Sequence, residues 1–405
     1  MSVKSASRRR IYLDYASATP ILPQAAREVA RVSKKLWGNP GSIHAEGVAA
    51  KQELLAAREK IAAALAVKAR EVVFVSGGTE ANNLAILGFA RHLILRDSVL
   101  KSQGSNLEGN LRTTHWITSV IEHPSVLECF SEIERLGGSV THLIPNEKGV
   151  ITPDILQKAL RKETVFVSIA WANHEIGVVQ PVAKLSQMIR KYEKECASTI
   201  VFHSDAGQTP LYKSSYPHTL GVDLFTLDSA KLYGPRGIGA VYLSNQVELA
   251  PIVLGGKQER GLRAGTENVA LAAGFAEAIS IVAKNRHAET ERMLALKKEF
   301  EQGVAKVAPD AFFNSNELGL PHLINVSFPS TQSEYLTLEL DRAGTAVATK
   351  SACREGEERI SQVVEVLGGP SWRATSTIRF SFGSGTTRAD VRRVVAELKR
   401  LLRKS

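Results

Sequence analysis

Short apolar runs alternate with longer amphipathic stretches through most of the chain. The runs Val72–Val75, Trp116–Ile121 and Val165–Ala170 have the length of buried strands. The stretches Ala49–Leu65 and Val182–Cys196 instead carry apolar residues three or four positions apart, as one face of a helix does. Strands that alternate with helices predict an α/β fold in which helices cover a sheet.

From Pro321 on, the pattern changes to shorter strands and helices, which is typical of a smaller α+β domain. Two helical patterns, Val269–Ala283 and His287–Val307, come before it, and the second is highly charged and is predicted to link the domains. The predicted division is an N-terminal segment that packs with the small domain, a large domain, and linker helices with the small domain, at residues 1–20, 21–265 and 266–405.

Composition limits the kinds of protein that this chain can be. It has 405 residues, of which 44% are hydrophobic, so it is long enough for two domains. It has neither an apolar run of transmembrane length nor the apolar core of a signal peptide, so no membrane contact is expected. The formal net charge is +10, and the excess is densest in the final residues, VRRVVAELKRLLRKS. We interpret this segment as the solvated face of a helix, with attraction to an acidic partner as the alternative.

Motifs and cysteines bear on two further properties, nucleic-acid binding and the redox compartment. Because no aromatic–basic RNA motif is present, direct nucleic-acid binding is not expected. The three cysteines, Cys129, Cys196 and Cys353, give no disulfide framework and indicate a reducing compartment such as the cytoplasm. The first two lie in segments that read as helices, where free cysteines are usually buried and inert. Cys353 lies between Lys350 and Arg354, which would lower the pKa of its thiol on an accessible loop.

One strand-to-helix junction has the composition of an anion site. The strand Val72–Val75 runs into Ser76–Thr79, and a helix begins there with Glu80 in its first turn. Backbone N–H groups point outward at such a start, and the helix dipole favours an anion. The backbone at Gly78 and the hydroxyl of Thr79 therefore predict a phosphate-binding site.

A lysine follows another apolar run. The stretch Asp223–Tyr242, DLFTLDSAKLYGPRGIGAVY, predicts a strand, a tight polar turn and a second strand. Lys231 lies at the end of the first strand, where a lysine held against apolar residues can act as an amine nucleophile; a solvated turn lysine is the alternative. His123 and Asp205 also follow predicted strands, and ligands of open α/β sheets bind at such ends.

Together these segments resemble the cysteine desulfurases of the long-loop (NifS/IscS-like) type, which belong to the class V aminotransferase group of fold-type I pyridoxal phosphate enzymes. The likeness starts near Ile11 and covers nearly the whole chain. Its motifs, in order, are IYLDYASATP (11–20), GNPGSIHAE (38–46), SGGTEANN (76–83), EHPSV (122–126), NHEIGVVQ (173–180), DAGQ (205–208), KLYGPRGIG (231–239), GGKQERGLRAGTEN (255–268), SAC (351–353) and IRFS (378–381). The resemblance implies a mainly parallel, seven-stranded sheet in the large domain.

The resemblance also implies a role for each matching residue. Lys231 would carry pyridoxal 5′-phosphate, Asp205 would keep its pyridine nitrogen protonated, and His123 would stack on its ring. The residues implied at the cofactor are Gly78, Thr79, His123, His174, Asp205, Gln208, Asp228, Ser229, Lys231 and Thr266. Thr266 would reach the phosphate of a neighbouring subunit, which implies a homodimer. Asn39 and Arg379 would bind the substrate, the latter by clamping its carboxylate.

The implied reaction removes sulfur from L-cysteine. The thiolate of Cys353 would attack the substrate sulfur, which leaves L-alanine and a persulfide on Cys353. The persulfide would pass to a sulfur-acceptor protein, such as an iron–sulfur scaffold or a component of tRNA thiolation. No metal is expected at the site. Selenocysteine lyase, another reaction of the same group, and a weakened paralogue that acts as a scaffold remain alternatives.

The chain departs from the family pattern at three places. Where the family has Ser-x-His before the lysine, this chain has Asp228-Ser229-Ala230. The carboxylate of Asp228 would repel a phosphate, unless it turns away to cap a backbone N–H or pair with Arg236, and Ser229 would supply a hydroxyl instead. His174 stands at the position of a family asparagine. The polar stretch 97–113 is predicted to be a surface loop, longer than the family has here.

Overall fold

The computed structural model describes residues 9–101, 111–316, 319–349 and 360–403. The chain forms two compact units. The larger unit comprises Pro20–Asn173 and Gln180–Arg286. The smaller unit comprises Met1–Thr19, His174–Val179 and His287–Ser405. The division that we expected placed residues 266–286 with the linker helices, whereas they belong to the larger unit here.

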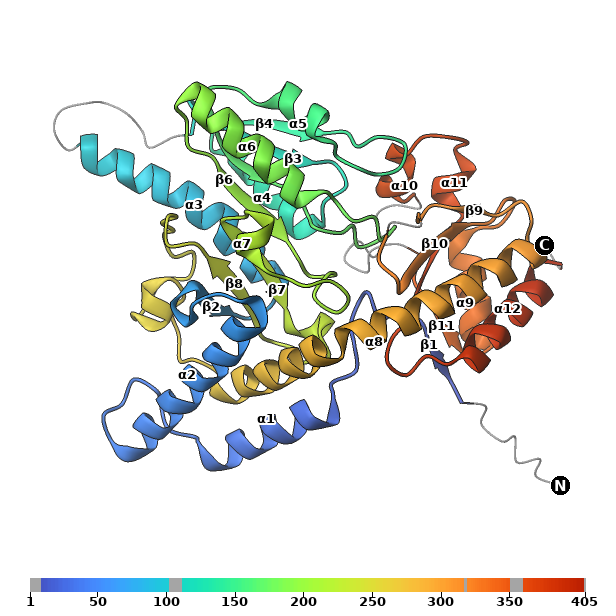
Figure 1. The fold of residues 1–405 in the computed structure, drawn as a ribbon, viewed down its shortest axis with the longest axis horizontal. Coiled ribbons are helices and arrows are strands. Elements are labelled where there is room, and N and C mark those ends of the chain that lie inside the picture. Colours follow the sequence, from blue (N-terminus) through green and yellow to red (C-terminus); the bar gives the residue numbers. More distant parts are fainter. Residues whose placement is uncertain (1–8, 102–110, 317–318, 350–359, 404–405) are drawn as a thin grey trace. The chain divides into compact units, whose positions relative to one another are not determined.

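The larger unit is built on a seven-stranded sheet, which Figure 1 shows with its helices. In spatial order its strands are β2 (Val72–Val75), β8 (Gly239–Leu243), β7 (Leu224–Asp228), β6 (Val201–Asp205), β5 (Thr164–Ser168), β3 (His115–Ser119) and β4 (Ser139–Leu143). Only β8 runs against its two neighbours. The other strand pairs of the sheet are parallel, so the predicted α/β fold with a mainly parallel sheet is confirmed.

Helices connect and cover these strands. They are α1 (Pro23–Lys35), α2 (Ala45–Leu65), α3 (Gly78–Lys101), α4 (Pro124–Arg135), α5 (Pro153–Ala159), α6 (Val182–Cys196) and α7 (Pro217–Leu220), with the short 3₁₀ helices η1 (Ala69–Glu71), η2 (Ser229–Lys231) and η3 (Gln258–Gly261). A core between α3, α4 and the sheet centres on the aromatic rings of Phe89, Trp116, Phe130 and Phe166. Cys129 lies in this core, and burial raises the pKa of its thiol to about 12.

The prediction of a polar loop over residues 97–113 is wrong at both ends that the structure describes. Residues 97–101, DSVLK, contain neither glycine nor proline, and they extend α3 to Lys101. Leu111 is only 1% exposed and belongs to the core of the larger unit. The stretch between these ends, residues 102–110, lies outside the described residues.

A single helix, α8 (Val269–Val307), stands where two helical patterns were predicted. The expected break after Ala283 is wrong because the next residues, Lys284, Asn285 and Arg286, include no proline or glycine and are tolerated in a helix interior. The boundary between the two units falls after Arg286, within this helix.

The smaller unit contains short strands and helices, as expected for an α+β domain. Its antiparallel sheet has β10 (Leu323–Ser327) between β12 (Thr377–Ser381) and β9 (Phe312–Phe313). The N-terminal strand β1 (Ile11–Tyr12) pairs in parallel with β11 (Thr345–Ala346). The unit also contains α9 (Ser333–Arg342), α10 (Gln362–Val366), α11 (Trp372–Thr375) and α12 (Arg388–Leu402).

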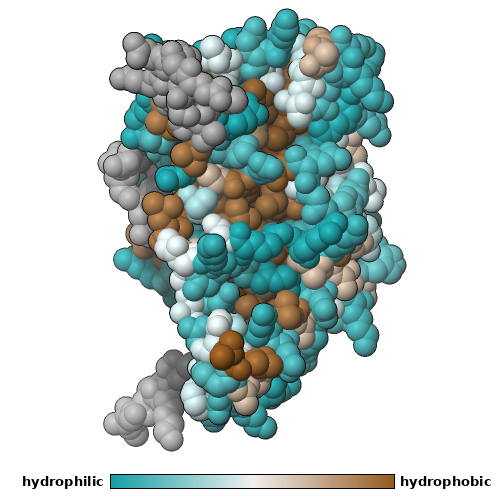
Figure 2. Space-filling model, turned by 90° about the vertical axis from the view of Figure 1, so that its left-hand side faces the viewer, coloured by the Kyte–Doolittle hydropathy of each residue, from teal (hydrophilic) through white to brown (hydrophobic). Residues whose placement is uncertain are grey.

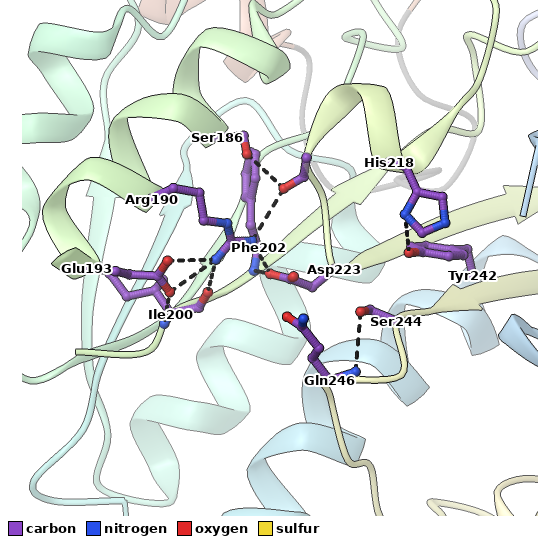
Figure 3. Close-up of polar contacts among 11 residues, drawn as sticks. Ser186, Arg190, Glu193, Ile200, Phe202, His218, Asp223, Tyr242, Ser244 and Gln246 are labelled. Atoms are coloured by element: carbon purple, nitrogen blue, oxygen red, sulfur yellow. Dashed lines mark hydrogen bonds and ion pairs between the residues drawn. The ribbon is translucent and has the colours of Figure 1, made fainter. Parts of the chain in front are cut away.

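Polar contacts hold the amino ends of β6 and β7 in place (Figure 3). Arg190 of α6 donates to the carboxylate of Asp223, just before β7, at 2.5 Å, and to the carbonyl of Ile200, just before β6, at 3.0 Å. The same Asp223 carboxylate accepts the backbone N–H of Phe202 at 2.8 Å. Because these bonds set the register of two central strands, they also set where the opposite, carboxyl ends of those strands lie.

One fold-level expectation concerns membranes. Across the described ranges, the structure contains no helix that is both long and apolar enough to span a bilayer.

Candidate functional site

Several of the predicted site residues follow the carboxyl ends of parallel strands in the larger unit. Asp205 is the last residue of β6, and Asp228 is the last residue of β7. Lys231 closes η2, the 3₁₀ turn that follows β7 directly. These two strands are neighbours, with Asp205 opposite Thr226, so the sheet itself brings the lysine close to the carboxylate.

Asp205 is held as a carboxylate beside Lys231. Its Oδ2 accepts a hydrogen bond from Asn82 Nδ2 at 2.8 Å, and its Oδ1 accepts the N–H of Gly207 at 2.8 Å. Burial alone would raise the pKa of Asp205, but the Lys231 ammonium and these hydrogen bonds lower it overall. The site therefore presents a fixed negative charge at neutral pH.

Gly207 leaves space between these two charged groups. A Cβ atom at this glycine would lie 3.1 Å from Asp205 Oδ1 and 3.4 Å from Lys231 Nζ. The amine and the carboxylate therefore border the same small volume, which no side chain of residue 207 enters. A pyridoxal ring needs an amine for its aldehyde and a carboxylate for its ring nitrogen, so this end of the site fits the predicted cofactor.

His123 connects to Asp205 through a chain of hydrogen bonds. Its Nδ1 lies 2.8 Å from Ser125 Oγ and accepts the N–H of Ser125 at 3.1 Å, so His123 is the N-cap of α4. Ser125 Oγ accepts from Asn82 Nδ2 at 2.8 Å, and Asn82 also donates to Asp205. Nδ1 is thus an acceptor, which places the proton of the neutral ring on Nε2. Stacking of His123 on a cofactor ring stays a prediction.

The sequence interpretation did not single out Asn82 or Ser125. Asn82 belongs to the SGGTEANN motif and lies three residues after Thr79, within one turn of the same helix. Ser125 follows His123 by two residues, a spacing typical of a side chain that caps the start of a helix. These spacings were available in the sequence, but Asn82 also donates to Asp205, which lies 123 residues from it along the chain.

The predicted phosphate end of the site is the junction of β2 and α3. α3 begins at Gly78, and Thr79 and Glu80 form its first turn. Glu80 Oε2 accepts the N–H of Ser76 at 2.7 Å, and its Oε1 accepts from Arg263 at 2.9 Å. Burial alone would raise the pKa of Glu80, but these partners lower it overall.

Asp228 also faces this junction. Its Oδ2 lies 3.3 Å from where a Cβ of Gly78 would be. Its Oδ1 caps the N–H of Ala230 at 3.0 Å, which is one of the two arrangements that we considered for it. Ser229 is fully buried and its hydroxyl lies against Gly234. Within the described ranges this hydroxyl has no hydrogen-bond partner. The phosphate end thus contains a carboxylate, which does not match a phosphate dianion.

The other predicted site residues of the larger unit lie in its loops. Gln208 is buried three residues after Asp205. Thr266 is exposed in the loop before α8. Asn39, predicted to bind substrate, is exposed and its Oδ1 accepts the N–H of Gly41 at 2.9 Å. Arg263, from the GGKQERGLRAGTEN motif, pairs with Glu80.

Two predicted residues belong to the smaller unit. Arg379 of β12 is buried, and its guanidinium donates to Asp14 Oδ1 at 2.8 Å, to Ser17 Oγ at 2.5 Å and to the carbonyl of His174 at 2.8 Å. Arg379 therefore does not face solvent, although it lies in a strand. His174 itself is buried, and its Nε2 lies 3.8 Å from Glu175 Oε1. Arg379 is thus a buried cation that forms an ion pair with Asp14.

The predicted sulfur acceptor lies in a part of the chain that the structure leaves undescribed. Cys353, Lys350 and Arg354 fall within residues 350–359, outside the described residues. The expectation of an accessible cysteine loop therefore stays a prediction.

A buried acid beside the site has an altered pKa. Glu122 is 4% exposed, and its Oε1 accepts the N–H of Ala170 at 2.8 Å. Its Oε2 has no hydrogen-bond partner among the described residues. Burial, with a smaller contribution from the negative charge of Asp205, raises the pKa of Glu122 to about 8. This side chain is therefore a neutral acid at neutral pH.

We expect Glu122→Gln to stabilise the cofactor-free protein increasingly as pH rises. An unfolded chain releases the Glu122 proton above about pH 4.3, whereas the folded protein holds it up to about pH 8. This raised pKa therefore costs stability across that window, and the neutral glutamine avoids the cost. At pH 8 the gain is on the order of a few kcal/mol. The measurement is urea unfolding at several pH values, with the exposed Glu147→Gln as control; parallel pH profiles would contradict the expectation.

The chain matches known proteins over almost its full length. A sequence model described as aminotransferase class-V matches residues 11–394. A Dictyoglomus turgidum protein named cysteine desulfurase IscS is 37% identical over 398 residues, which are 98% of this chain and 95% of that protein. A Bacillus subtilis protein named putative cysteine desulfurase IscS 1 is 35% identical and covers 95% of this chain and 96% of its own length.

Solved structures agree with the sequence relatives. A structure named NifS-like protein superposes with a TM-score of 0.86 at 28% identity, over 98% of this chain and 100% of that one. DndA from Streptomyces lividans has a TM-score of 0.72 at 29% identity, over 94% of this chain and 99% of that one. Both cover the larger and the smaller unit.

Proposed function

The chain belongs to the class-V aminotransferase family, in its cysteine desulfurase branch, and on this premise we propose that it takes sulfur from L-cysteine with Lys231 and Cys353 as its two reactive residues. Enzymes of this family use pyridoxal 5′-phosphate. The observation that carries the proposal is the pairing of Lys231 and Asp205 across the space that Gly207 leaves open.

Each residue of the larger unit has a task in this proposal. Lys231 would hold the cofactor through its aldehyde carbon, and Asp205 would keep a proton on the ring nitrogen. The protonated ring, when bound, supplies a sink for the electrons released at the substrate carbons. Asn82 keeps the Asp205 carboxylate in place, and Ser125 orients the His123 ring so that its Nε2 proton is available to the site.

Cys353 accepts the sulfur. Its thiolate attacks the sulfur of the substrate, so a sulfur–sulfur bond forms while the bond between the substrate's β-carbon and sulfur breaks. The electron pair of the broken bond stays with the carbon side, which takes up a proton and leaves as L-alanine. The persulfide on Cys353 then passes its outer sulfur to an acceptor protein, such as an iron–sulfur scaffold or a tRNA-thiolation component. Thiolate chemistry suits a reducing compartment such as the cytoplasm.

Arg379 binds the substrate carboxylate in this proposal. A buried guanidinium offers two parallel donors, which match a carboxylate in geometry and charge. In the structure Nη2 donates to Asp14 Oδ1 at 2.8 Å and Nη1 donates to the carbonyl of His174, so this guanidinium already binds one carboxylate. The substrate would share Arg379 with Asp14 or displace it.

We expect Arg379→Ala to raise KM for L-cysteine by about 10- to 100-fold while the Kd of pyridoxal phosphate changes little, because a charge-assisted pair is lost from the substrate alone. Asp14→Asn is the matched control, since it removes the ion pair and keeps the arginine. If Asp14→Asn raised KM as much as Arg379→Ala does, Arg379 would have a structural role instead.

A homodimer is the assembly that we propose. Large apolar side chains are exposed on the segments around α2 and after β8: Trp37 is 73%, Ile43 98% and Leu254 67% exposed. A pocket of about 680 Å³ is lined by residues of both segments, among them Leu55 and Lys257. Figure 2 shows patches of apolar surface on the side of the molecule that lies to the left in Figure 1. A second copy would cover such surface and bring Thr266 to its partner's phosphate end.

The test of this function is direct. Purified protein reconstituted with pyridoxal phosphate is incubated with L-[³⁵S]cysteine and a reductant, and alanine and sulfide are quantified. Equal amounts of alanine and sulfide are expected, with the label on the protein when the reductant is omitted. A protein that binds the cofactor but releases no alanine would contradict the proposal. A preference for selenocysteine over cysteine in the same assay would assign it to a selenocysteine lyase instead.

A further inference from the structure

The carboxylate of Asp228 occupies the phosphate end of the site in a fixed orientation. Its Oδ1 is held by the N–H of Ala230 at 3.0 Å, at the start of η2. Its Oδ2 lies 3.3 Å from the position of a Gly78 Cβ, and it faces the first residue of α3. Because Oδ1 accepts the Ala230 N–H, the side chain cannot rotate Oδ2 away from Gly78 without losing this hydrogen bond.

A phosphate at the start of α3 would therefore lie close to a second anion. Two negative charges in contact in a partly buried site disfavour each other's ionised form. A phosphate monoester loses its second proton near pH 6, so at neutral pH it arrives mostly as a dianion. Retaining one proton converts the contact from repulsion into a short, charge-assisted hydrogen bond between a carboxyl and a phosphate oxygen.

We propose that this chain binds pyridoxal phosphate together with one additional proton, held between Asp228 Oδ2 and a phosphate oxygen, so that affinity falls as pH rises. This inference rests on the proposed function, and it assigns Asp228 as a positioning residue that makes cofactor loading dependent on pH. The site takes the phosphate as a monoanion, or as a dianion beside a neutral carboxyl; the proton count is the same in both.

Other charges near this point do not change with the proposed variant. The strand β8 places only Gly239 opposite Asp228. The charged groups on the other neighbouring elements are Lys231 of η2, Asp205 of β6, Glu80 of α3 and Arg263, which pairs with Glu80. Asparagine at position 228 keeps the shape and the acceptor for Ala230 N–H, and it removes only the titratable group.

The experiment uses two probes without an aldehyde, so that Lys231 chemistry does not enter. Pyridoxine 5′-phosphate carries the phosphate, and pyridoxine lacks it. Their Kd values are measured from about pH 6 to pH 9 for the wild type, for Asp228→Asn, and for Asp154→Asn, the same change at an exposed position of α5. We expect the Kd of pyridoxine phosphate for the wild type to rise relative to that for Asp228→Asn by about tenfold per pH unit above pH 6. Pyridoxine should show no such difference, and Asp154→Asn should follow the wild type.

A second measurement needs no variant. Calorimetry in two buffers of different ionisation enthalpy counts the protons taken up on binding. Near pH 7.5 the wild type should take up about one proton with pyridoxine phosphate and none with pyridoxine. Parallel pH profiles for wild type and Asp228→Asn, or no proton uptake, would overturn the inference while the proposed function stands. Failure of pyridoxal phosphate itself to bind at any pH would overturn both.

Discussion

Lys231→Ala should leave a folded but colourless protein, and cysteine desulfuration should fall by several orders of magnitude. In the wild type the amine stands at the space beside Gly207, 3.4 Å from where a Cβ would be, so it is the lysine placed to bind the cofactor aldehyde. Its loss also removes the ammonium beside the Asp205 carboxylate, which raises the pKa of Asp205 relative to that in the wild type. The measurements are visible absorbance after reconstitution with pyridoxal phosphate, borohydride trapping, and alanine production.

The control for this variant is Lys158→Ala, which removes a lysine from an exposed position of α5. That protein should remain yellow and active. Mass spectrometry of the borohydride-reduced wild type should place the added cofactor mass on the peptide that contains Lys231. A Lys231→Ala protein that remained yellow through another lysine would show that the site is assigned to the wrong residue.

Cys353→Ser should bind pyridoxal phosphate with wild-type affinity and yet form no protein persulfide. A serine hydroxyl ionises far above neutral pH and is a poor nucleophile toward sulfur, so the transfer step has no acceptor. The other cysteines do not replace it. Cys129 is buried in the core of the larger unit with a thiol pKa of about 12, and Cys196 lies at the C-terminal end of α6. Sulfide release should fall by a factor on the order of 10² or more.

The readout is the mass of one sulfur atom added to the intact protein after incubation with L-cysteine, together with sulfide release under reductant. Cys196→Ser is the matched control, and it should form the persulfide as the wild type does. Because Cys353 lies outside the described residues, this experiment rests on its place in the SAC motif and on the family. Undiminished sulfide release from Cys353→Ser would rule out the proposed mechanism.

The positions of Lys231 and Asp205 at strand ends could be predicted from the sequence because their signals are local. Lys231 and Asp205 each follow a run of apolar residues that forms a buried strand, and strands that are parallel in one sheet have their carboxyl ends at the same edge. The helix Val182–Cys196 was predicted with the bounds that the structure has, since its apolar residues recur with helical spacing. Order of motifs along the chain, rather than any single one, identified the family.

Element ends and side-chain directions required the tertiary structure. The continuity of α8 and the extension of α3 to Lys101 stayed open in the sequence, because the propensities of these residues permit both a helix and a loop. In the sequence, Glu122 is only the first residue of the EHPSV motif. Only the fold buries its side chain and so raises its pKa to about 8, which makes it a neutral acid at pH 7.

Asp228 shows most clearly which information comes from the sequence and which comes from the fold. The sequence by itself determined that a carboxylate stands three residues before Lys231, and it left open whether this carboxylate faces a phosphate or turns away to a cap or to Arg236. The fold combines the first two arrangements, because β7 ends at Asp228, η2 offers the Ala230 N–H to one oxygen, and α3 begins at Gly78 beside the other. In the same way Asn82 and Asp205 meet across 123 residues of chain. Local propensity and periodicity act within a few residues, whereas such contacts depend on how distant strands and helices pack.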